Sequence, residues 1–120
     1  MTKFRRFEDI EAWKKSRVLV GRLYELTRRE PFRRDFALTD QARRAGVSIM
    51  LNIAEGSARK TDKEFAQFLF VAAGSAAELK ATFYVAKDQD YIDEQTFLKF
   101  YEQTDEISRM ISGLIKYLRQ

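Results

Sequence analysis

Long stretches of this 120-residue chain contain nothing that would stop an α-helix. Pro31 is the only proline, and the five glycines are scattered. Apolar residues recur every three or four positions, which is the period of an amphipathic helix, and no segment alternates with the period of two that a strand requires. The sequence predicts an all-α fold, an antiparallel up-and-down four-helix bundle. We expect one domain, residues 1–120, with helices at about 9–28, 40–58, 62–87 and 94–119.

Residues that typically cap helices lie at three of the predicted starts. Thr39 is the expected N-cap of the second helix, with Asp40 in its first turn. Thr61 and Glu64 have the spacing of a capping box at the start of the third helix. Asp93 is expected to cap the fourth helix.

The second and third predicted helices are apolar around more of their circumference than a bundle requires. A bundle helix needs an apolar arc of only somewhat more than ~100°. The apolar surface of residues 40–58 is interrupted by only one narrow polar line, and residues 62–87 carry two apolar stripes. Because large exposed apolar patches are uncommon on monomers, we expect both helices to help form an interface in a homo-oligomer. The alternative is a monomer whose small residues let its helices approach closely.

The narrow polar lines on these two helices have two interpretations. They are either solvated helix faces or a partly buried hydrogen-bond network in which arginine neutralises the acids. The residues concerned are Arg44, Ser48, Asn52, Glu55, Arg59, Ser75 and Glu78. A metal site is not expected, because di-metal bundles use repeated Glu-x-x-His elements and this chain has no histidine. No cofactor is expected either.

The sequence contains neither cysteine nor histidine. Disulfides, thiolate chemistry and the commonest acid–base group near neutral pH are thereby excluded. There is no Gly-rich phosphate-binding loop, so we expect no catalytic residue and no enzymatic activity. No apolar run approaches the ~20 residues of a membrane span, and the first residues lack the apolar core of a signal peptide. We therefore expect a cytoplasmic protein with no membrane partner.

Positive charge is concentrated in the first half of the chain. Residues 1–60 hold 15 Lys and Arg against 8 Asp and Glu, whereas residues 61–120 hold 7 against 10. This imbalance either favours a polyanion or an acidic partner, or lets the two halves face each other within the fold. The candidate nucleic-acid contacts are Lys3, Arg5, Arg6, Lys14, Lys15, Arg22, Arg28, Arg29, Arg33 and Arg34. The basic loop also contains Phe32 and Phe36, which we expect to anchor it to the core; stacking on unpaired bases is the alternative.

Two segments carry a resemblance to a known family. They are LTDQARRAGVSIMLNIAEGSAR (38–59) and FLFVAAGSAAELKATFYVAKDQDYI (68–92), and the likeness extends from FEDIEAW to the last helix. Its most specific parts lie at 43–45, 48–49, 52–56, 74–75 and 78–79. In these positions the chain resembles the bacterial four-helix bundle proteins encoded in intervening sequences of 23S ribosomal RNA genes. Met50 stands where members often have proline, so we expect a straighter second helix.

The resemblance implies a ring-like homopentamer of four-helix bundles. It also implies kinship with the accessory proteins of diversity-generating retroelements, whose basic pentamers are thought to engage nucleic acid and a reverse transcriptase. The family has no settled biochemical activity. We therefore expect a non-catalytic homo-oligomer that is a candidate for binding RNA or DNA through the first helix and the loop after it. The alternative is a protein-interaction scaffold that docks an acidic partner and has no nucleic-acid role.

Overall fold

The computed structural model describes residue 4 and residues 6–120, so the predictions for Lys3 and Arg5 lie outside the described residues. This part of the chain forms four α-helices, two short 3-10 helices and no strand, which confirms the expected all-α class. The elements, in order, are η1 (Phe7–Asp9), α1 (Glu11–Thr27), η2 (Phe32–Arg34), α2 (Phe36–Ser57), α3 (Asp62–Asp88) and α4 (Glu94–Leu118).

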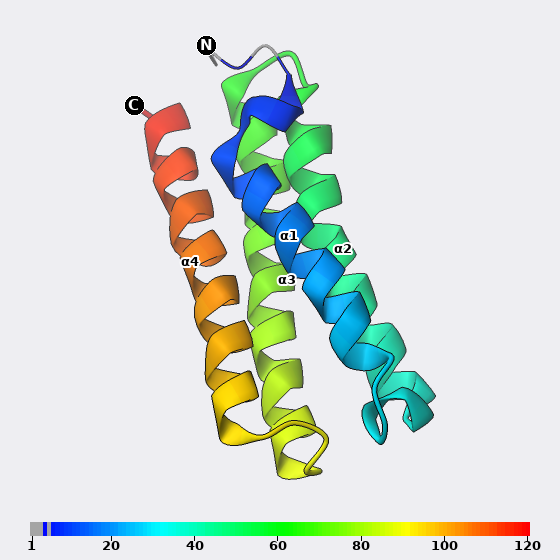
Figure 1. The fold of residues 1–120 in the computed structure, drawn as a ribbon. Coiled ribbons are helices and arrows are strands. Elements are labelled where there is room, and N and C mark those ends of the chain that lie inside the picture. Colours follow the sequence, from blue (N-terminus) through cyan, green and yellow to red (C-terminus); the bar gives the residue numbers. More distant parts are fainter. Residues whose placement is uncertain (1–3, 5) are drawn as a thin grey trace.

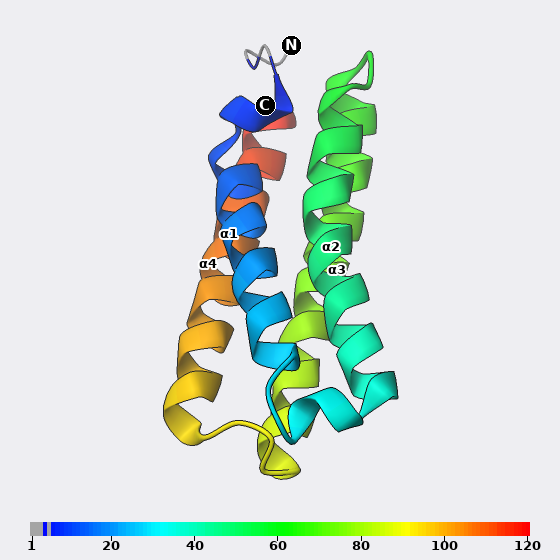
Figure 2. The same ribbon diagram turned by 45° about the vertical axis from the view of Figure 1, so that its right-hand side comes forward.

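The long helices lie side by side in an elongated body of 46 × 19 × 19 Å. Figure 1 traces the chain along α1, back along α2, forward along α3 and back along α4. The 3-10 helix η1, the end of α4 and the α2–α3 link therefore share one end of the molecule, and the other two links share the opposite end. Figure 2 shows α1 and α4 on one side and α2 and α3 on the other. The packing is most extensive between α2 and α3 and much less extensive between α1 and α4.

The start of α2 differs from the sequence prediction. The Asp35 carboxylate accepts a hydrogen bond from the Leu38 N–H at 3.0 Å, so Asp35 is the N-cap and α2 begins at Phe36. The prediction of Thr39 as the N-cap is wrong, because Asp35 offers an acceptor one turn earlier. The Thr39 hydroxyl donates instead to the Phe32 carbonyl at 3.3 Å. α2 then continues without interruption through Met50.

The predicted caps of α3 and α4 are confirmed. The Thr61 hydroxyl accepts from the Glu64 N–H at 3.1 Å and lies 3.0 Å from the Glu64 carboxylate, to which it donates. The Asp93 carboxylate accepts from the Thr96 N–H at 2.8 Å. Both side chains satisfy backbone donors that have no partner within the helix.

The core lies along the inward stripes of the four long helices. Its largest buried members include Leu19, Leu23, Ile49, Ile53, Phe65, Leu69, Leu79, Phe83, Ile107 and Ile111. Phe32 is also buried, so the expectation that it anchors the α1–α2 link is confirmed. Its ring lies 5.4 Å from that of Tyr91, which joins the two links at this end of the molecule.

α3 is apolar on its outer face as well as its inner one. We call the exposed face the outer stripe; it consists of Phe70, Val71, Gly74, Ala77, Glu78, Ala81, Tyr84 and Val85. Glu78 is its one charged member. The expected second apolar face is therefore exposed on α3, whereas on α2 Val47 and Met50 are half-buried and Leu51 is the one large apolar side chain exposed within 40–58.

The apolar character of α3 also bears on the membrane prediction. An 18-residue window of α3 has a mean hydropathy of 1.3, so length and composition alone would let this helix cross a membrane. The expectation that no segment approaches a membrane span does not hold for α3 by this measure. Core helices of bundles have the same composition, and α3 packs against both α2 and α4.

Candidate nucleic-acid interface

Acidic neighbours pair with two of the basic residues predicted along α1. Lys14 lies 3.1 Å from the carboxylate of Glu11, one turn earlier on the same helix. Lys15 lies 3.2 Å from the carboxylate of Glu106, which belongs to α4. Both pairs are solvent-exposed and worth only about 0–1 kcal/mol, but they reduce the positive charge at this part of α1.

Further ion pairs occur at the two ends of the predicted basic surface. Arg6 lies 3.1 Å from Glu8, and the hydrogen bond from Arg6 lowers the pKa of the Glu8 carboxyl. At the other end, Arg33 and Arg34 both contact the Glu30 carboxylate, at 3.0 and 2.6 Å. One acid therefore neutralises part of the charge of two arginines.

Three of the predicted contact residues have a positive charge that no acidic side chain offsets among the described residues. Arg22, Arg28 and Arg29 form no ion pair within the part of the chain that the structure describes. Arg22 and Arg29 line a groove between α1 and α4, together with Lys99, which also has no acidic partner there. We call this the α1–α4 groove; its lining is Arg22, Glu25, Leu26, Arg29, Thr96, Lys99, Phe100 and Gln103. Three cations against the single acid Glu25 make it positively charged.

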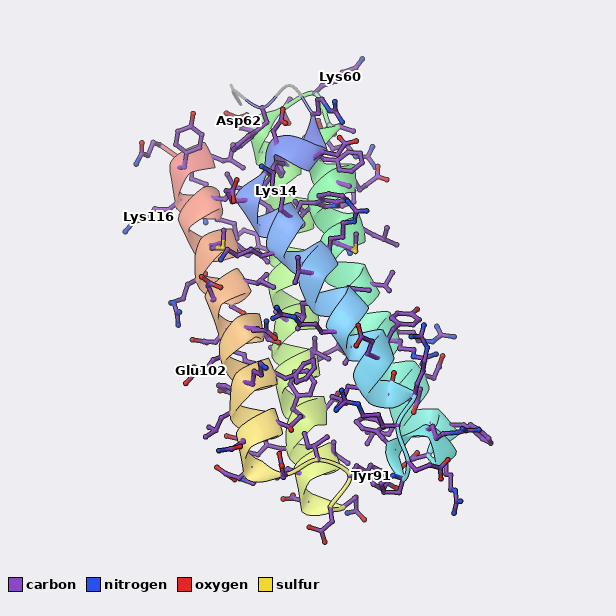
Figure 3. All side chains as sticks on the ribbon, in the orientation of Figure 1. Lys14, Lys60, Asp62, Tyr91, Glu102 and Lys116 are labelled. Carbon is purple, nitrogen blue, oxygen red and sulfur yellow. The ribbon has the colours of Figure 1, made fainter. Side chains whose placement is uncertain are left out.

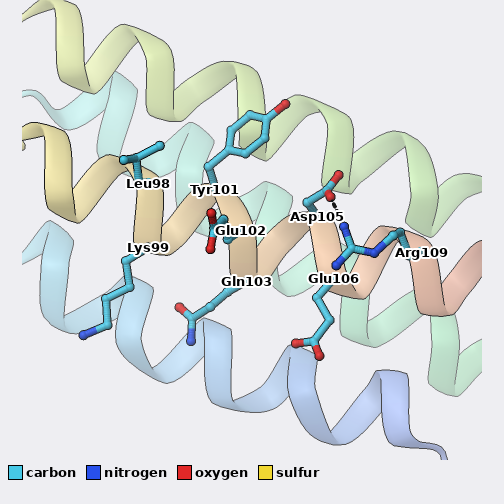
Figure 4. Close-up of a pocket in the computed structure, with 8 residues that line it drawn as sticks. All are labelled: Leu98, Lys99, Tyr101, Glu102, Gln103, Asp105, Glu106 and Arg109. Carbon is cyan, nitrogen blue, oxygen red and sulfur yellow. Dashed lines mark hydrogen bonds and ion pairs between the residues drawn. The ribbon is translucent and has the colours of Figure 1, made fainter.

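Two α4 residues of this groove were missed in the sequence analysis. Figure 4 shows the side chains of Lys99 and Gln103 extending from α4 toward α1, beside an open hollow that follows the outer side of α4. The Gln103 oxygen Oε1 is buried and has no hydrogen-bond partner among the described residues. Since an unpaired buried polar atom costs about 1–3 kcal/mol, a ligand group that donates to Oε1 would gain a hydrogen bond.

The turn formed by residues 28–36 continues the positive surface beyond the end of α1. The Arg33 N–H donates to the Arg29 carbonyl at 2.9 Å, and the Arg34 N–H donates to the Pro31 carbonyl at 3.1 Å. Asp35 ends the turn, and its second carboxylate oxygen accepts from the Tyr91 hydroxyl at 3.0 Å, which raises the pKa of Tyr91. The turn is therefore held by its own backbone and by the α3–α4 link.

Phe36 does not anchor this turn. Its side chain is 80% exposed, whereas Phe32 is 1% exposed. The expectation of an anchoring role for Phe36 is wrong, because the Asp35 cap makes Phe36 the first residue of α2 and leaves its ring outside the core. An exposed aromatic ring therefore lies directly after an arginine-rich turn.

The predicted polar network forms only at its centre. The Asn52 amide donates to the Ser48 hydroxyl at 3.0 Å, and the Ser48 and Ser75 hydroxyls lie 2.7 Å apart. In the Ser48–Ser75 hydrogen bond either hydroxyl can be the donor, because Ser48 can accept from Asn52 and still donate to or accept from Ser75. This short chain of hydrogen bonds joins α2 to α3 at half-buried and buried positions.

The charged members of that prediction lie outside the network. Arg44 pairs with Asp40 at 2.8 Å and Arg59 pairs with Glu55 at 2.7 Å, in each case along α2. Glu78 is exposed and has no ion pair with any described residue. The arginines therefore do not neutralise Glu78, and these four charged positions of the prediction are exposed.

The candidate site consists of cations, one amide and one exposed ring. Among the described residues, no three His, Cys, Asp or Glu side chains lie close enough together to hold a metal ion. The chemistry that the arrangement supports is non-covalent binding of anions by guanidinium and ammonium groups.

The fold and this surface together define an all-α, four-helix protein with a cationic groove. Residues 8–113 match the family described as 23S rRNA-intervening sequence protein, and the chain belongs to that family. The fold is similar to the crystal structure of a protein of unknown function from the S23 ribosomal protein family of Bacteroides thetaiotaomicron. The TM-score is 0.80 at 23% identity, covering 88% of this chain and 98% of that chain. No curated protein matches the chain.

Proposed function

We propose that this chain is a non-catalytic subunit of a homo-oligomer of up-and-down bundles that binds nucleic acid through the α1–α4 groove and the turn of residues 28–36. The observation that carries the proposal is the set of unpaired cations on this surface: Arg22, Arg28, Arg29 and Lys99. The backbone phosphates of RNA and DNA supply the negative charge that such a surface attracts. Contacts of this kind position a nucleic acid without reading its sequence.

The oligomeric part of the proposal rests on the outer stripe of α3. Its large members are about half exposed: Phe70 at 47%, Val71 at 53%, Tyr84 at 50% and Val85 at 46%. Burial of apolar surface is favourable by roughly 25 cal/mol for each Å² removed from water. Contiguous exposed apolar patches of this kind mark association surfaces. We propose that other copies of this chain cover the stripe, five copies in all by family resemblance. Repetition of the groove around the oligomer would then add avidity for a long polyanion.

A double substitution tests the groove. We expect Arg29→Gln with Lys99→Gln to weaken binding to RNA and DNA in electrophoretic shift experiments across a salt series. On duplex DNA the slope of log K against log salt should become shallower by about 0.9 for each phosphate that the protein no longer neutralises. The matched control is Lys60→Gln with Lys116→Gln, which removes the same charge from cations that also lack an acidic partner among the described residues. Figure 3 shows both at the end of the molecule opposite Tyr91.

The outcomes distinguish binding at the α1–α4 groove from binding driven by the overall net charge of the protein. An equal reduction of affinity in both double variants would mean that net charge alone drives binding. The proposal that nucleic acid binds at the α1–α4 groove would then be wrong. A wild-type protein that binds no RNA or DNA at low salt would overturn the nucleic-acid function itself. In that case the second candidate remains, a protein-interaction scaffold with no nucleic-acid role. The same unpaired cations favour that candidate, since an acidic protein surface would also complement their charge.

A charge placed in the outer stripe tests the oligomer. Ala77 is exposed near the middle of the stripe, and Ser112 is exposed on α4. We expect Ala77→Glu to dissociate the assembly in sedimentation and native mass measurements, because a second carboxylate beside Glu78 would be buried in the same interface and the two like charges would repel. Ser112→Glu should leave the assembly intact. A dilute wild-type protein that sediments as a stable folded monomer would contradict the proposal.

A further inference from the structure

Phe36 is the most exposed large apolar side chain among the described residues. It is 80% exposed, ahead of Leu51 at 58% and Val71 at 53%. The ring of Phe32, four residues earlier, packs instead against Tyr91 and is buried. The Phe36 ring therefore contributes little to the core.

The segment that leads into Phe36 is rich in arginine and locally ordered. Residues 28–36 contain four arginines and two acids, a net charge of +2. Both acids are engaged, Glu30 with Arg33 and Arg34, and Asp35 as the cap of α2 and the acceptor from Tyr91. Phe36 follows the cap directly, so its backbone position is fixed.

We propose that Phe36 is a stacking platform for an unpaired base, and that the nucleic acid bound at this turn is single-stranded. This inference rests on the proposed function and adds the strand state of the ligand. An exposed ring beside cations can stack on any base of a single strand while the cations hold its phosphates. A duplex keeps its base faces stacked within the helix, so Phe36 would add nothing to duplex binding. Loss of one stacked base weakens single-strand binding by about 5- to 150-fold.

Two substitutions at Phe36 separate the ring from its apolar character. We expect Phe36→Ala and Phe36→Leu each to weaken binding of a short oligouridine by at least about 5-fold in fluorescence anisotropy, since neither side chain has an aromatic face. Affinity for a duplex RNA of the same length should not change. Leu51→Ala is the matched control, because it removes an exposed apolar side chain of α2 outside the turn. Circular dichroism checks folding, which an exposed position should not affect.

A third substitution reports stacking directly. In Phe36→Trp we expect oligouridine to quench the indole fluorescence and inorganic polyphosphate, which has no bases, to leave it unchanged. Wild-type protein, with its single Trp13, supplies the background.

Each outcome supports or overturns the inference. Equal weakening toward single strand and duplex, or an indole that binding does not quench, would overturn stacking while leaving phosphate binding intact. A blue-shifted indole that acrylamide cannot reach in the free oligomer would show that another copy covers Phe36, and would also overturn it. Failure of the wild-type protein to bind single strand, duplex and polyphosphate alike would overturn the proposed function instead.

Discussion

Gly56 is buried near the end of α2, where a larger residue has no room. A Cβ atom built there would lie 2.8 Å from Phe65 Cδ1, 2.8 Å from Phe68 Cβ and 3.2 Å from the Phe65 carbonyl oxygen. We expect Gly56→Ala to lower the free energy of unfolding by about 1–3 kcal/mol, because the start of α3 must move away. Gly113 on α4 has open space around it, so Gly113→Ala should raise stability by about 0.5–1 kcal/mol. Urea denaturation measures both, and a Gly56→Ala variant as stable as the wild type would contradict the tight packing at Gly56.

Asp93 should give α4 a stability that depends on pH. Hydrogen bonds from the side chain and then the backbone N–H of Thr96 hold the pKa of Asp93 below its ordinary value of 3.8. A lowered folded pKa means that the stabilisation is complete above pH 3.8 and is lost as the pH falls through the folded value. We expect Asp93→Ala to lower the Tm near neutral pH, with the difference from wild type narrowing below pH 3.8. A difference that stays constant to the lowest pH would show that the charge does not contribute.

Asp35 illustrates what local sequence could not decide. Asp35 and Thr39 are both good N-caps, and local preference does not separate them. The Tyr91 hydroxyl, from a residue 56 positions away, also binds Asp35 and helps to fix the earlier start. The exposure of Phe36 follows from that start, whereas the sequence predicted that Phe36 lies in a loop and that its ring anchors that loop to the core.

At the scale of the helices, periodicity predicted how much of each circumference is apolar but not what covers it. The extra apolar residues of α2 are mostly half-buried beside α1 and α3, whereas the outer stripe of α3 is left exposed. The same limit applies to the candidate site. The sequence indicated Arg22 on α1 and Arg29 just after it, but Lys99 joins them only because α4 packs beside α1. Likewise, the pairing of Lys15 with Glu106 depends on tertiary contact.

The hydrogen bond between Ser48 of α2 and Ser75 of α3 should couple these two residues energetically. Ser48 accepts from Asn52, and its hydroxyl shares a hydrogen bond with the Ser75 hydroxyl in which either group can donate. We expect Ser48→Ala and Ser75→Ala each to lower the free energy of unfolding by about 1 kcal/mol. The double variant should be destabilised by less than the sum, because both changes remove the same bond. A double-mutant cycle by chemical denaturation measures this, with the exposed Ser112→Ala as a control; strict additivity would contradict the shared bond.

For the whole molecule, the proposed covering of the outer stripe by other copies predicts that stability depends on protein concentration. If copies of the chain bind one another only when folded, mass action stabilises the folded state. We expect the Tm of the wild-type protein to rise with concentration, and the Tm of Ala77→Glu to stay constant. Thermal unfolding followed by circular dichroism over a dilution series measures both. A wild-type Tm that is independent of concentration would argue against a reversible assembly.

The position of Glu78 restricts the symmetry of the proposed oligomer. It lies midway along the outer stripe, one heptad from both Val71 and Val85, with no cation paired to it in the described chain. A two-fold axis through the centre of the stripe would bring two like carboxylates together in a dry seam, which is strongly unfavourable. A head-to-tail contact, in which the stripe meets a different face of its neighbour, avoids that repulsion. Such heterologous contacts close into rings or extend as filaments, so if other copies cover the stripe as we propose, this glutamate disfavours a simple two-fold dimer.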